Sequence, residues 1–560
     1  MAHLDLAGID YTLPDGRGLL SGVDLRVGAG QRVALIGPNG AGKTTLIRIA
    51  TGELRPHHGA VTTTGEIGVM QQWVGRLAEN RTVRDLLAAH APARPREVAQ
   101  RLDRAEEQMM LRDDEAAQMA YAQALADWAD VGGYQLEAHW DEICIDVLAQ
   151  SWDKAQWRSV DTLSGGEAKR LVLSALLRSS AEILILDEPD NALDVPAKRW
   201  LEDQLRATDQ AVLFISHDRQ MLAAAATHVV TLEPGVAGSS AWVHGGGFDG
   251  YAQARIDRMT RLAELRRRWD EEHARLKALV LMYKQKASYN ADMASRLQAA
   301  RTRLAAFETA GPPQEVTRDQ HVQMRLRGGR TAKRAVVLER LALTGLTEPV
   351  DAEIWFGERV AVLGANGTGK SHLLRLLAAG GTDPEVDNQP VTEQRPEPVA
   401  HTGIARLGSR VRPGWFAQQR VPQHLIGRTL LEVLHRGDGA RRGMPREEAG
   451  RVLDRYELAA SAEQQVQTLS GGQVARFQIL LLELSGATLL LLDEPTDNLD
   501  LHSAEALERG LESFEGTVLA VTHDRWFTRG FDRFIQVGAD GAVVETDEPL
   551  WADDGGARVR

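Results

Sequence analysis

The feature that most constrains this chain is an internal repeat, in which two sets of the same short motifs occur in the same order. Each set holds a glycine-rich stretch, an LSGG stretch, an apolar run that ends in Asp-Glu, and a histidine. From LSGG to the histidine, the corresponding residues lie 306 positions apart: Leu163 and Leu469, Glu188 and Glu494, and His217 and His523. A constant offset over three motifs indicates a tandem duplication, so we expect two domains of the same fold.

The glycine-rich stretches read GPNGAGKT in the first half and GANGTGKS in the second, and each follows an apolar run. A strand, a GxxxxGK[ST] loop and a helix together bind phosphate, because backbone N–H groups and the positive helix N-terminus face the anion. In this pattern Lys43 and Lys370 reach the β- and γ-phosphates, and Thr44 and Ser371 hold Mg²⁺. The predicted nucleotide-binding residues here are Gly37, Pro38, Asn39, Gly40, Ala41, Gly42, Lys43, Thr44, Thr45, Gly364, Ala365, Asn366, Gly367, Thr368, Gly369, Lys370 and Ser371.

Two adjacent carboxylates follow a short apolar run in each half. The runs ILIL and LLLL are typical of buried parallel strands, and they lead into Asp187-Glu188 and Asp493-Glu494. Ligands of doubly wound folds bind at the carboxyl ends of such strands. We therefore predict that each Asp binds Mg²⁺ through water and that each Glu polarises the water that attacks ATP.

An LSGG[EQ] stretch between a glycine loop and an LDEP strand resembles the signature of ABC ATPases, and the resemblance covers nearly all of the chain. It implies an α/β fold with two P-loop ABC-type nucleotide-binding domains, in which each ATP lies between the glycine loop of one cassette and the LSGG of the other. The helix that follows LSGG offers its N-terminus as a second anion site. One site then combines Lys43, Glu188 and Ser470, and the other combines Lys370, Glu494 and Ser164. The signature residues that we expect to bind nucleotide are Ser164, Gly165, Gly166, Glu167, Ser470, Gly471, Gly472 and Gln473.

The same resemblance implies roles for further residues. Gln72 and Gln418 match the glutamine that touches Mg²⁺ and the attacking water, and His217 and His523 match the catalytic histidine that senses the γ-phosphate. Tyr11 lies where the family often stacks an aromatic ring on adenine, although a plain buried tyrosine explains it equally well.

The halves differ after the shared Asp-Glu-Pro. Residues 190–194 read DNALD and residues 496–500 read TDNLD. We expect these differences to alter communication between the two sites without removing a catalytic group.

Between the repeats lies a basic segment that is predicted to be helical. Residues 252–310 lack Gly and Pro, and they carry apolar residues at helical spacing before and after a break near residues 288–290. We expect an antiparallel helical hairpin. Residues 252–334 hold 19 Lys and Arg against 9 Asp and Glu, in a chain whose net charge is −13. An ordinary charge run is a solvated surface, but a long basic hairpin on an acidic body also suits phosphate contacts, with Tyr283 and Tyr289 available to stack on bases.

Two cassettes, a charged helical linker and no apolar run long enough to span a membrane resemble the ABC-F family. Its members are similar to translation factors that enter the tRNA exit site of the ribosome, and some displace antibiotics. The resemblance implies a ribosome partner, contacted at rRNA and peptidyl tRNA through the linker, and leaves antibiotic resistance and general translation control both open. Two alternatives share the ATP chemistry: the ATPase subunit of a membrane transporter and a DNA-handling ATPase.

The remaining expectations concern organisation and location. We divide the chain into a first cassette over residues 1–251, a linker over 252–334 and a second cassette over 335–560. The chain lacks a signal sequence and its single cysteine, Cys144, allows no internal disulfide, so we expect a cytoplasmic protein. Pairing of cassettes within one chain favours a monomer. Two length differences between the halves predict helices in residues 90–150 and a surface hairpin or loop in residues 381–410.

Overall fold

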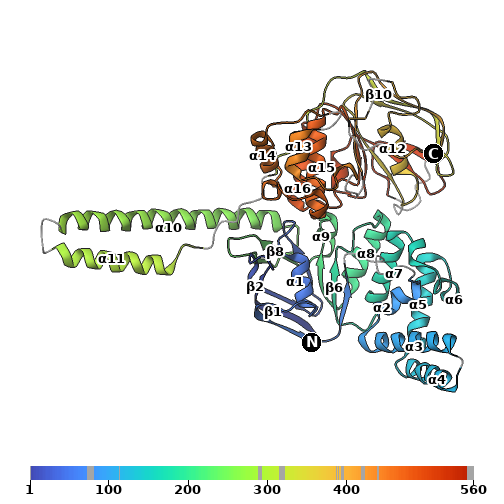
Figure 1. Cartoon of the computed structure of the whole chain (residues 1–560), viewed down its shortest axis with the longest axis horizontal. Helices are drawn as coiled ribbons and strands as arrows, with labels where there is room; N and C mark the ends of the chain where they lie inside the picture. The colour runs from blue at the N-terminus through green and yellow to red at the C-terminus, as the bar shows by residue number, and fades with distance from the viewer. Residues whose placement is uncertain are drawn as a thin grey trace.

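The computed structural model places the two cassettes against each other and projects a long helical hairpin to one side (Figure 1). The residues it describes are 2–71, 81–112, 114–287, 293–313, 322–385, 388, 390–391, 396–417, 423–437 and 441–551. Gln72 and Gln418, the two predicted glutamine ligands, lie outside the described residues, as does the break at residues 288–290.

The first cassette is built on a sheet that has, within the described residues, six strands in the order β5-β6-β7-β3-β8-β9. Its neighbours run parallel except for β8 and β9. The strands are β3 (Arg32–Ile36), β5 (Ile67–Met70), β6 (Ile183–Asp187), β7 (Ala211–Ile215), β8 (His228–Glu233) and β9 (Ser240–His244). A separate antiparallel sheet contains β2 (Gly18–Gly28), β1 (His3–Thr12) and β4 (His58–Thr64). Strand β6 is buried along its whole length, and alternate residues enter the cores on the two faces of the sheet.

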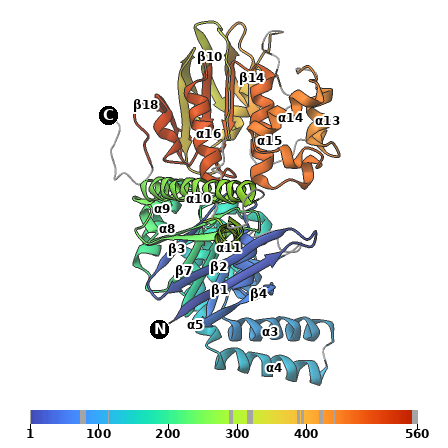
Figure 2. The ribbon, with the colours of Figure 1, turned by 90° about the vertical axis from the view of Figure 1, so that its left-hand side faces the viewer.

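Helices cover the faces of this sheet and include an outlying pair. They are α1 (Lys43–Ala50), α2 (Val83–Ala89), α3 (Ala93–Leu111), α4 (Glu115–Asp130), α5 (Gly133–Leu148), α6 (Trp152–Ala155), α7 (Gly165–Leu177), α8 (Val195–Ala207) and α9 (Arg219–Ala225). The helices expected in residues 90–150 are confirmed as α3, α4 and α5, and Cys144 is buried among them. Figure 2 shows α3 and α4 side by side, away from the sheet.

The second cassette repeats the first. Within the described residues its sheet runs β14-β15-β16-β12-β17-β18, beside an antiparallel sheet β11-β10-β13. The strands are β10 (Arg334–Leu343), β11 (Val350–Trp355), β12 (Arg359–Gly364), β13 (His401–Leu407), β14 (Pro413–Phe416), β15 (Leu489–Asp493), β16 (Thr517–Val521), β17 (Arg533–Val537) and β18 (Val543–Thr546). The helices are α12 (Lys370–Ala378), α13 (Leu430–Arg436), α14 (Arg446–Arg455), α15 (Gly471–Ser485) and α16 (Leu501–Glu512).

One expectation about this cassette was partly wrong. The surface hairpin or loop predicted over residues 381–410 contains β13, which pairs with β10 as β4 pairs with β1. Pairing with an existing strand satisfies the backbone of this Gly- and Thr-containing segment, so tertiary contacts overrode its local composition.

The linker forms the expected antiparallel hairpin. Helix α10 (Tyr251–Ala287) has 37 residues and packs along α11 (Met293–Ala310). At 1.5 Å per residue, α10 is about 55 Å long. Trp269 stacks on Phe307 with ring centroids 5.2 Å apart, and His273 Nε2 lies 2.9 Å from Glu308 Oε1, so both helices act as one arm.

Both ends of the linker are attached to a cassette. At the start of α10, the hydroxyls of Tyr251 and Thr231 lie 2.9 Å apart, and Arg258 Nη1 donates to Glu233 Oε1 at 2.5 Å. After α11, Val322, Met324 and Leu326 are buried in the core of the second cassette. The residues on either side of the hairpin thus pack against different cassettes.

Candidate active sites

Each glycine loop holds its lysine in place. Gly42 and Gly369 have φ of 98° and 96° and directly precede α1 and α12. Lys43 Nζ donates to two carbonyl oxygens of its own loop at 2.7 and 3.2 Å, and Lys370 makes the corresponding bonds at 2.9 and 2.6 Å. Burial lowers the pKa of both lysines, while nearby carboxylates oppose that shift. Each lysine is thus a buried cation held by backbone carbonyls, which suits an incoming phosphate.

The two glycine loops also contact the opposite cassette. Asn39 N donates to Asp500 Oδ2 at 3.1 Å, and Asn39 Nδ2 donates to the Asn498 carbonyl at 3.2 Å. Asn366 Nδ2 donates to the Ala192 carbonyl at 3.2 Å. Each loop therefore reaches the segment that follows the acidic strand of the other half.

The LSGG segments face the glycine loops across the same interface. Ser164 and Ser470 cap α7 and α15, and each forms a reciprocal capping box with Glu167 or Gln473. A Cβ atom at Gly472 would lie 1.7 Å from Asn39 Nδ2. The glycines thus allow the close approach of the two cassettes.

A cavity of about 370 Å³ lies where the first LSGG meets the second glycine loop. Its lining includes Ser164, Gly165 and Gly166 from one cassette and Lys370, Ser371, Asp493, Glu494 and His523 from the other. The structure therefore brings together, in one cavity, the residues of both halves that were predicted to share a nucleotide.

The hydroxyl–carboxylate pairs suit Mg²⁺. Ser371 Oγ donates to Asp493 Oδ1 at 3.0 Å, and burial raises the pKa of Asp493. Burial and the adjacent Glu188 raise the pKa of Asp187 to about 7, while Lys43 and a hydrogen bond from Thr44 oppose the shift. These oxygen atoms are ligands that Mg²⁺ prefers. No group of three His, Cys, Asp or Glu that could hold a metal ion occurs among the described residues.

The catalytic candidates are arranged differently in the two halves. His523 N donates to Glu494 Oε2 at 3.0 Å, and His523 Nε2 lies 3.0 Å from Asn366 Oδ1. In the first half, His217 Nε2 is 4.0 Å from Glu188 Oε1, and neither of its ring nitrogens has a hydrogen-bond partner within the described residues.

The two glutamates share a strained backbone conformation, and the two histidines share a lowered pKa. Glu188 and Glu494 have φ of 50° and 47°, which is a strained conformation for a residue with a side chain. Burial lowers the pKa of His217 to about 4 and that of His523 well below its ordinary value, so both imidazoles are neutral at pH 7. Burial also raises the pKa of Glu494 well above its usual range.

Tyr11 lies near the end of β1, where its ring centroid is 5.1 Å from that of His57. It is partly buried and packs against the core of the first cassette. The predicted stacking on adenine stays a prediction.

Comparisons with known proteins identify the family. The family model described as ABC transporter matches residues 20–191 and 347–497. A protein named "Antibiotic resistance protein" from Mycobacteroides abscessus is 61% identical over 98% of this chain and 100% of its own length. ATP-binding cassette sub-family F member 3 from Mus musculus is 29% identical over 95% of this chain and 70% of its own length. The chain belongs to the ABC-F family.

The fold is also similar to that of solved ABC proteins. A structure titled "Model of ribosome-bound archaeal Pelota and ABCE1" matches with a TM-score of 0.54 and 18% identity, covering 96% of this chain and 78% of that one. No helix among the described residues of this ABC-F chain is long and apolar enough to cross a membrane.

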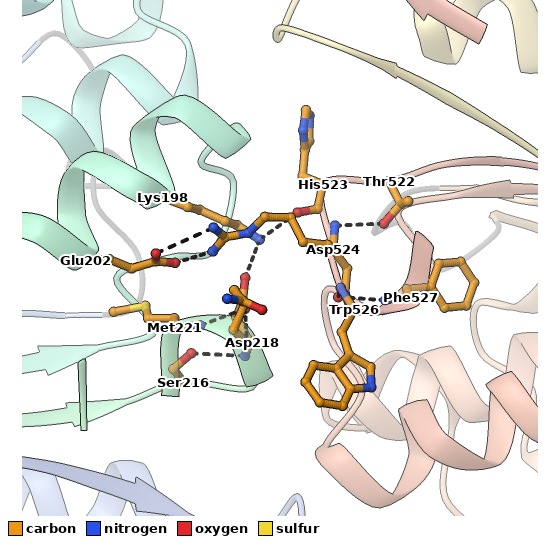
Figure 3. Close-up of polar contacts among 12 residues, drawn as sticks. Lys198, Glu202, Ser216, Asp218, Met221, Thr522, His523, Asp524, Trp526 and Phe527 are labelled. Atoms are coloured by element: carbon orange, nitrogen blue, oxygen red, sulfur yellow. Dashed lines mark hydrogen bonds and ion pairs between the residues drawn. The ribbon is translucent and has the colours of Figure 1, made fainter. Parts of the chain in front are cut away.

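Sequence reasoning missed the polar contacts that join the ABC-F cassettes beside the sites. Arg219 Nη1 donates to Glu508 Oε2 at 3.1 Å, and Arg525 forms an ion pair with Glu202, which is labelled in Figure 3. These four residues also lie 306 positions apart in pairs, so the offset of the repeat was a signal that could have found them. The buried Lys198 between the cassettes gave no such signal.

Proposed function

We propose that the chain is a cytoplasmic ABC-F ATPase that binds the ribosome and uses ATP binding and hydrolysis to modulate translation or to protect the ribosome from antibiotics. The observation that carries the proposal is the combination of nucleotide sites between two cassettes with a long basic arm attached to both of them (Figure 1). The 61% identical relative named as an antibiotic resistance protein supports the second outcome.

The catalytic part of the proposal assigns a role to each motif of the repeat. Lys43 and Lys370 bind the phosphates, and the N-termini of α7 and α15 approach the same phosphates from the opposite cassette. Mg²⁺, when bound with ATP, neutralises phosphate charge, and the hydroxyls and aspartates described above would hold it, together with Gln72 and Gln418. Glu188 and Glu494 orient the attacking water, and the neutral histidines hold the terminal phosphate by hydrogen bonding.

The proposed binding to the ribosome rests on the linker. We take residues 1–251 and 335–560 as the cassettes and residues 252–334 as the arm between them. Basic side chains on the arm are exposed, including Arg267, Arg275 and Arg303 at 72%, 68% and 65%. Exposed guanidinium groups on a helix of this length suit the phosphates of rRNA and peptidyl tRNA. Because both ends of the arm are attached to a cassette, closure on ATP would change how it is presented.

The test is sedimentation of a Glu188→Gln, Glu494→Gln double variant with ribosomes. We expect this variant to bind ATP, to release little phosphate and to stay with ribosomes through a gradient that contains ATP. A Lys43→Ala, Lys370→Ala variant is the matched control, because it keeps the linker and loses ATP binding, and it should sediment free. The proposal fails if the double glutamine variant also sediments free, or if DNA rather than ribosomes stimulates the ATPase activity of the wild-type chain.

A further inference from the structure

Two ion pairs join the cassettes, and the repeat relates them to each other. Arg219–Glu508 and Arg525–Glu202 each connect the residue two positions after a catalytic histidine with a helix of the opposite half, α16 or α8. These two ion pairs therefore occupy equivalent positions in the two halves. The interface residues that lie between the two pairs are not equivalent in the two halves.

A buried lysine at the interface breaks the symmetry. Lys198 on α8 is 6% exposed. Its Nζ donates to Asp218 Oδ2 at 3.0 Å and to the His523 carbonyl at 3.4 Å (Figure 3). Asp218 directly follows His217, so one ammonium group joins the histidine loops of both sites. The residue 306 positions after Lys198 is Ala504, and the second cassette therefore has no equivalent group.

The contact reaches the catalytic carboxylate of the second site in two bonds. Lys198 holds the carbonyl oxygen of His523, and the N–H of His523 donates to Glu494 Oε2 at 3.0 Å. A shift of Asp218 would move Lys198 and thereby the His523 backbone. The repeat-related contact, from Asp524 to the His217 carbonyl, would need a lysine at position 504, where this chain has alanine.

Capping of the loop alone does not explain the lysine, which also lies among several carboxylates. Burial lowers the pKa of Lys198, and the charges of Asp218, Asp190, Asp497 and Asp524 raise it, whereas the second half has Thr496 in place of Asp190. Asp218 Oδ1 accepts from Gln220 N and Met221 N at 2.9 and 3.0 Å, which caps α9. Asp524 makes the same cap in the second half, from Trp526 N and Phe527 N at 2.8 and 3.0 Å, with alanine at position 504. The capped loop thus forms without a lysine at that position.

We propose that Lys198 is a positioning residue that couples the histidine loop of the first ATP site to Glu494 of the second. The inference rests on the proposed ATPase function and deepens it, because it makes the two sites unequal. A change at the first site, such as loss of the γ-phosphate beside His217, would reach the second site through Asp218 and Lys198.

The test is a double-mutant cycle at the second site alone. In a Glu188→Gln background, only the second site retains its carboxylate, so phosphate release reports Glu494. We expect Lys198→Met and Asp218→Asn each to lower kcat by roughly fivefold, with the KM for ATP within about twofold of the background. Because both act through one contact, the Lys198→Met, Asp218→Asn double variant should be no slower than either single one.

The repeat supplies a matched control. In a Glu494→Gln background, where only the first site turns over, Asp524→Asn should leave kcat within about twofold, since Lys198 is hydrogen-bonded to Asp218 and interacts with Asp524 through its charge. Effects of Lys198→Met and Asp218→Asn that multiply would overturn the inference. So would an equal loss caused by Asp524→Asn at the first site.

The double variant separates an effect on stability from an effect on kcat. Lys198→Met alone leaves Asp218 buried without its cation, which lowers stability, whereas the double variant removes both charges and keeps the cap through the Asn side chain. If the double variant has the same Tm and the same kcat as the Glu188→Gln background, the lysine has no positioning role. If the Glu188→Gln background itself releases no phosphate, the two-site ATPase proposal fails and this inference fails with it.

Discussion

The two cassettes share their phosphate-binding residues and differ at three positions of the surface where they meet. The glycine-loop lysines, the hydroxyl–carboxylate pairs and the capped LSGG helices recur in both halves with similar geometry. The interface diverges: the first half has Lys169, Asp190 and Lys198 where the second has Ala475, Thr496 and Ala504. The two halves thus keep the groups that would bind ATP and differ in the groups that we propose couple one site to the other.

The largest difference that we expect concerns the two LSGG glycines. A Cβ atom at Gly472 would lie 1.7 Å from Asn39 Nδ2 and 2.8 Å from the Asn498 carbonyl, whereas one at Gly166 would meet the Ala192 carbonyl at 3.2 Å. Gly472→Ala should therefore oppose closure by about 3 kcal/mol, or roughly 100-fold in ATP turnover at the first site.

The matching substitution in the first half, Gly166→Ala, should cost less than about 1 kcal/mol at the second site. Phosphate release in the single-site backgrounds measures both effects. Gly450→Ala on α14 is the control, because no atom lies within 4 Å of a Cβ there. Equal losses from the two LSGG substitutions would show that the closer packing at Gly472 has no consequence.

A second difference separates the histidines. His523→Ala removes the hydrogen bond with Asn366 Oδ1, and the same asparagine bonds to the opposite cassette, so we expect about a tenfold loss of turnover at the second site. His217 makes no hydrogen bond through its ring within the described residues, and His217→Ala should lower turnover at the first site by about threefold or less. The single-site backgrounds again measure each effect. A larger loss of ATP turnover from His217→Ala than from His523→Ala would contradict the prediction.

The two ion pairs between the cassettes should differ in stability. The side chains of Arg525 and Glu202 are 11% and 6% exposed, and those of Arg219 and Glu508 are 9% and 23% exposed. Arg525→Met leaves a more deeply buried carboxylate, at Glu202, than Arg219→Met leaves at Glu508. We therefore expect Arg525→Met to destabilise the chain by about 3 kcal/mol, against about 1 kcal/mol for Arg219→Met. Thermal unfolding of the two variants at one protein concentration measures both losses of stability. An equal shift in Tm for the two variants would contradict the prediction.

The smallest expected effect on ATP turnover comes from the linker. Replacing Arg267, Arg275 and Arg303 with Ala should leave ATP hydrolysis without ribosomes unchanged and should weaken ribosome binding. The slope of log affinity against log salt should fall by about one for each phosphate that an arginine no longer neutralises. Arg451→Ala on α14, at a site 73% exposed, is the control. Unchanged ribosome binding would remove the arm from the proposed interface.

Sequence predicted the features that are encoded locally. The strand–loop–helix pattern, the helices that follow the two LSGG stretches and the Gly- and Pro-free linker depend on neighbours in the chain, and the structure contains the corresponding elements. Strand β13 was missed because pairing with β10 determines it. Lys198 was missed because its partners, Asp218 and the His523 carbonyl, lie 20 and 325 positions away.

The central claim is that each ATP site combines residues of both cassettes, and one measurement tests it directly. In a Glu494→Gln background the remaining turnover belongs to the site with Lys43 and Glu188. We predict that Ser470→Arg, in the other cassette, abolishes that turnover, and that Ser164→Arg, in the same cassette as Glu188, leaves it largely intact. The opposite result, with Ser164→Arg abolishing turnover and Ser470→Arg sparing it, would contradict the claim.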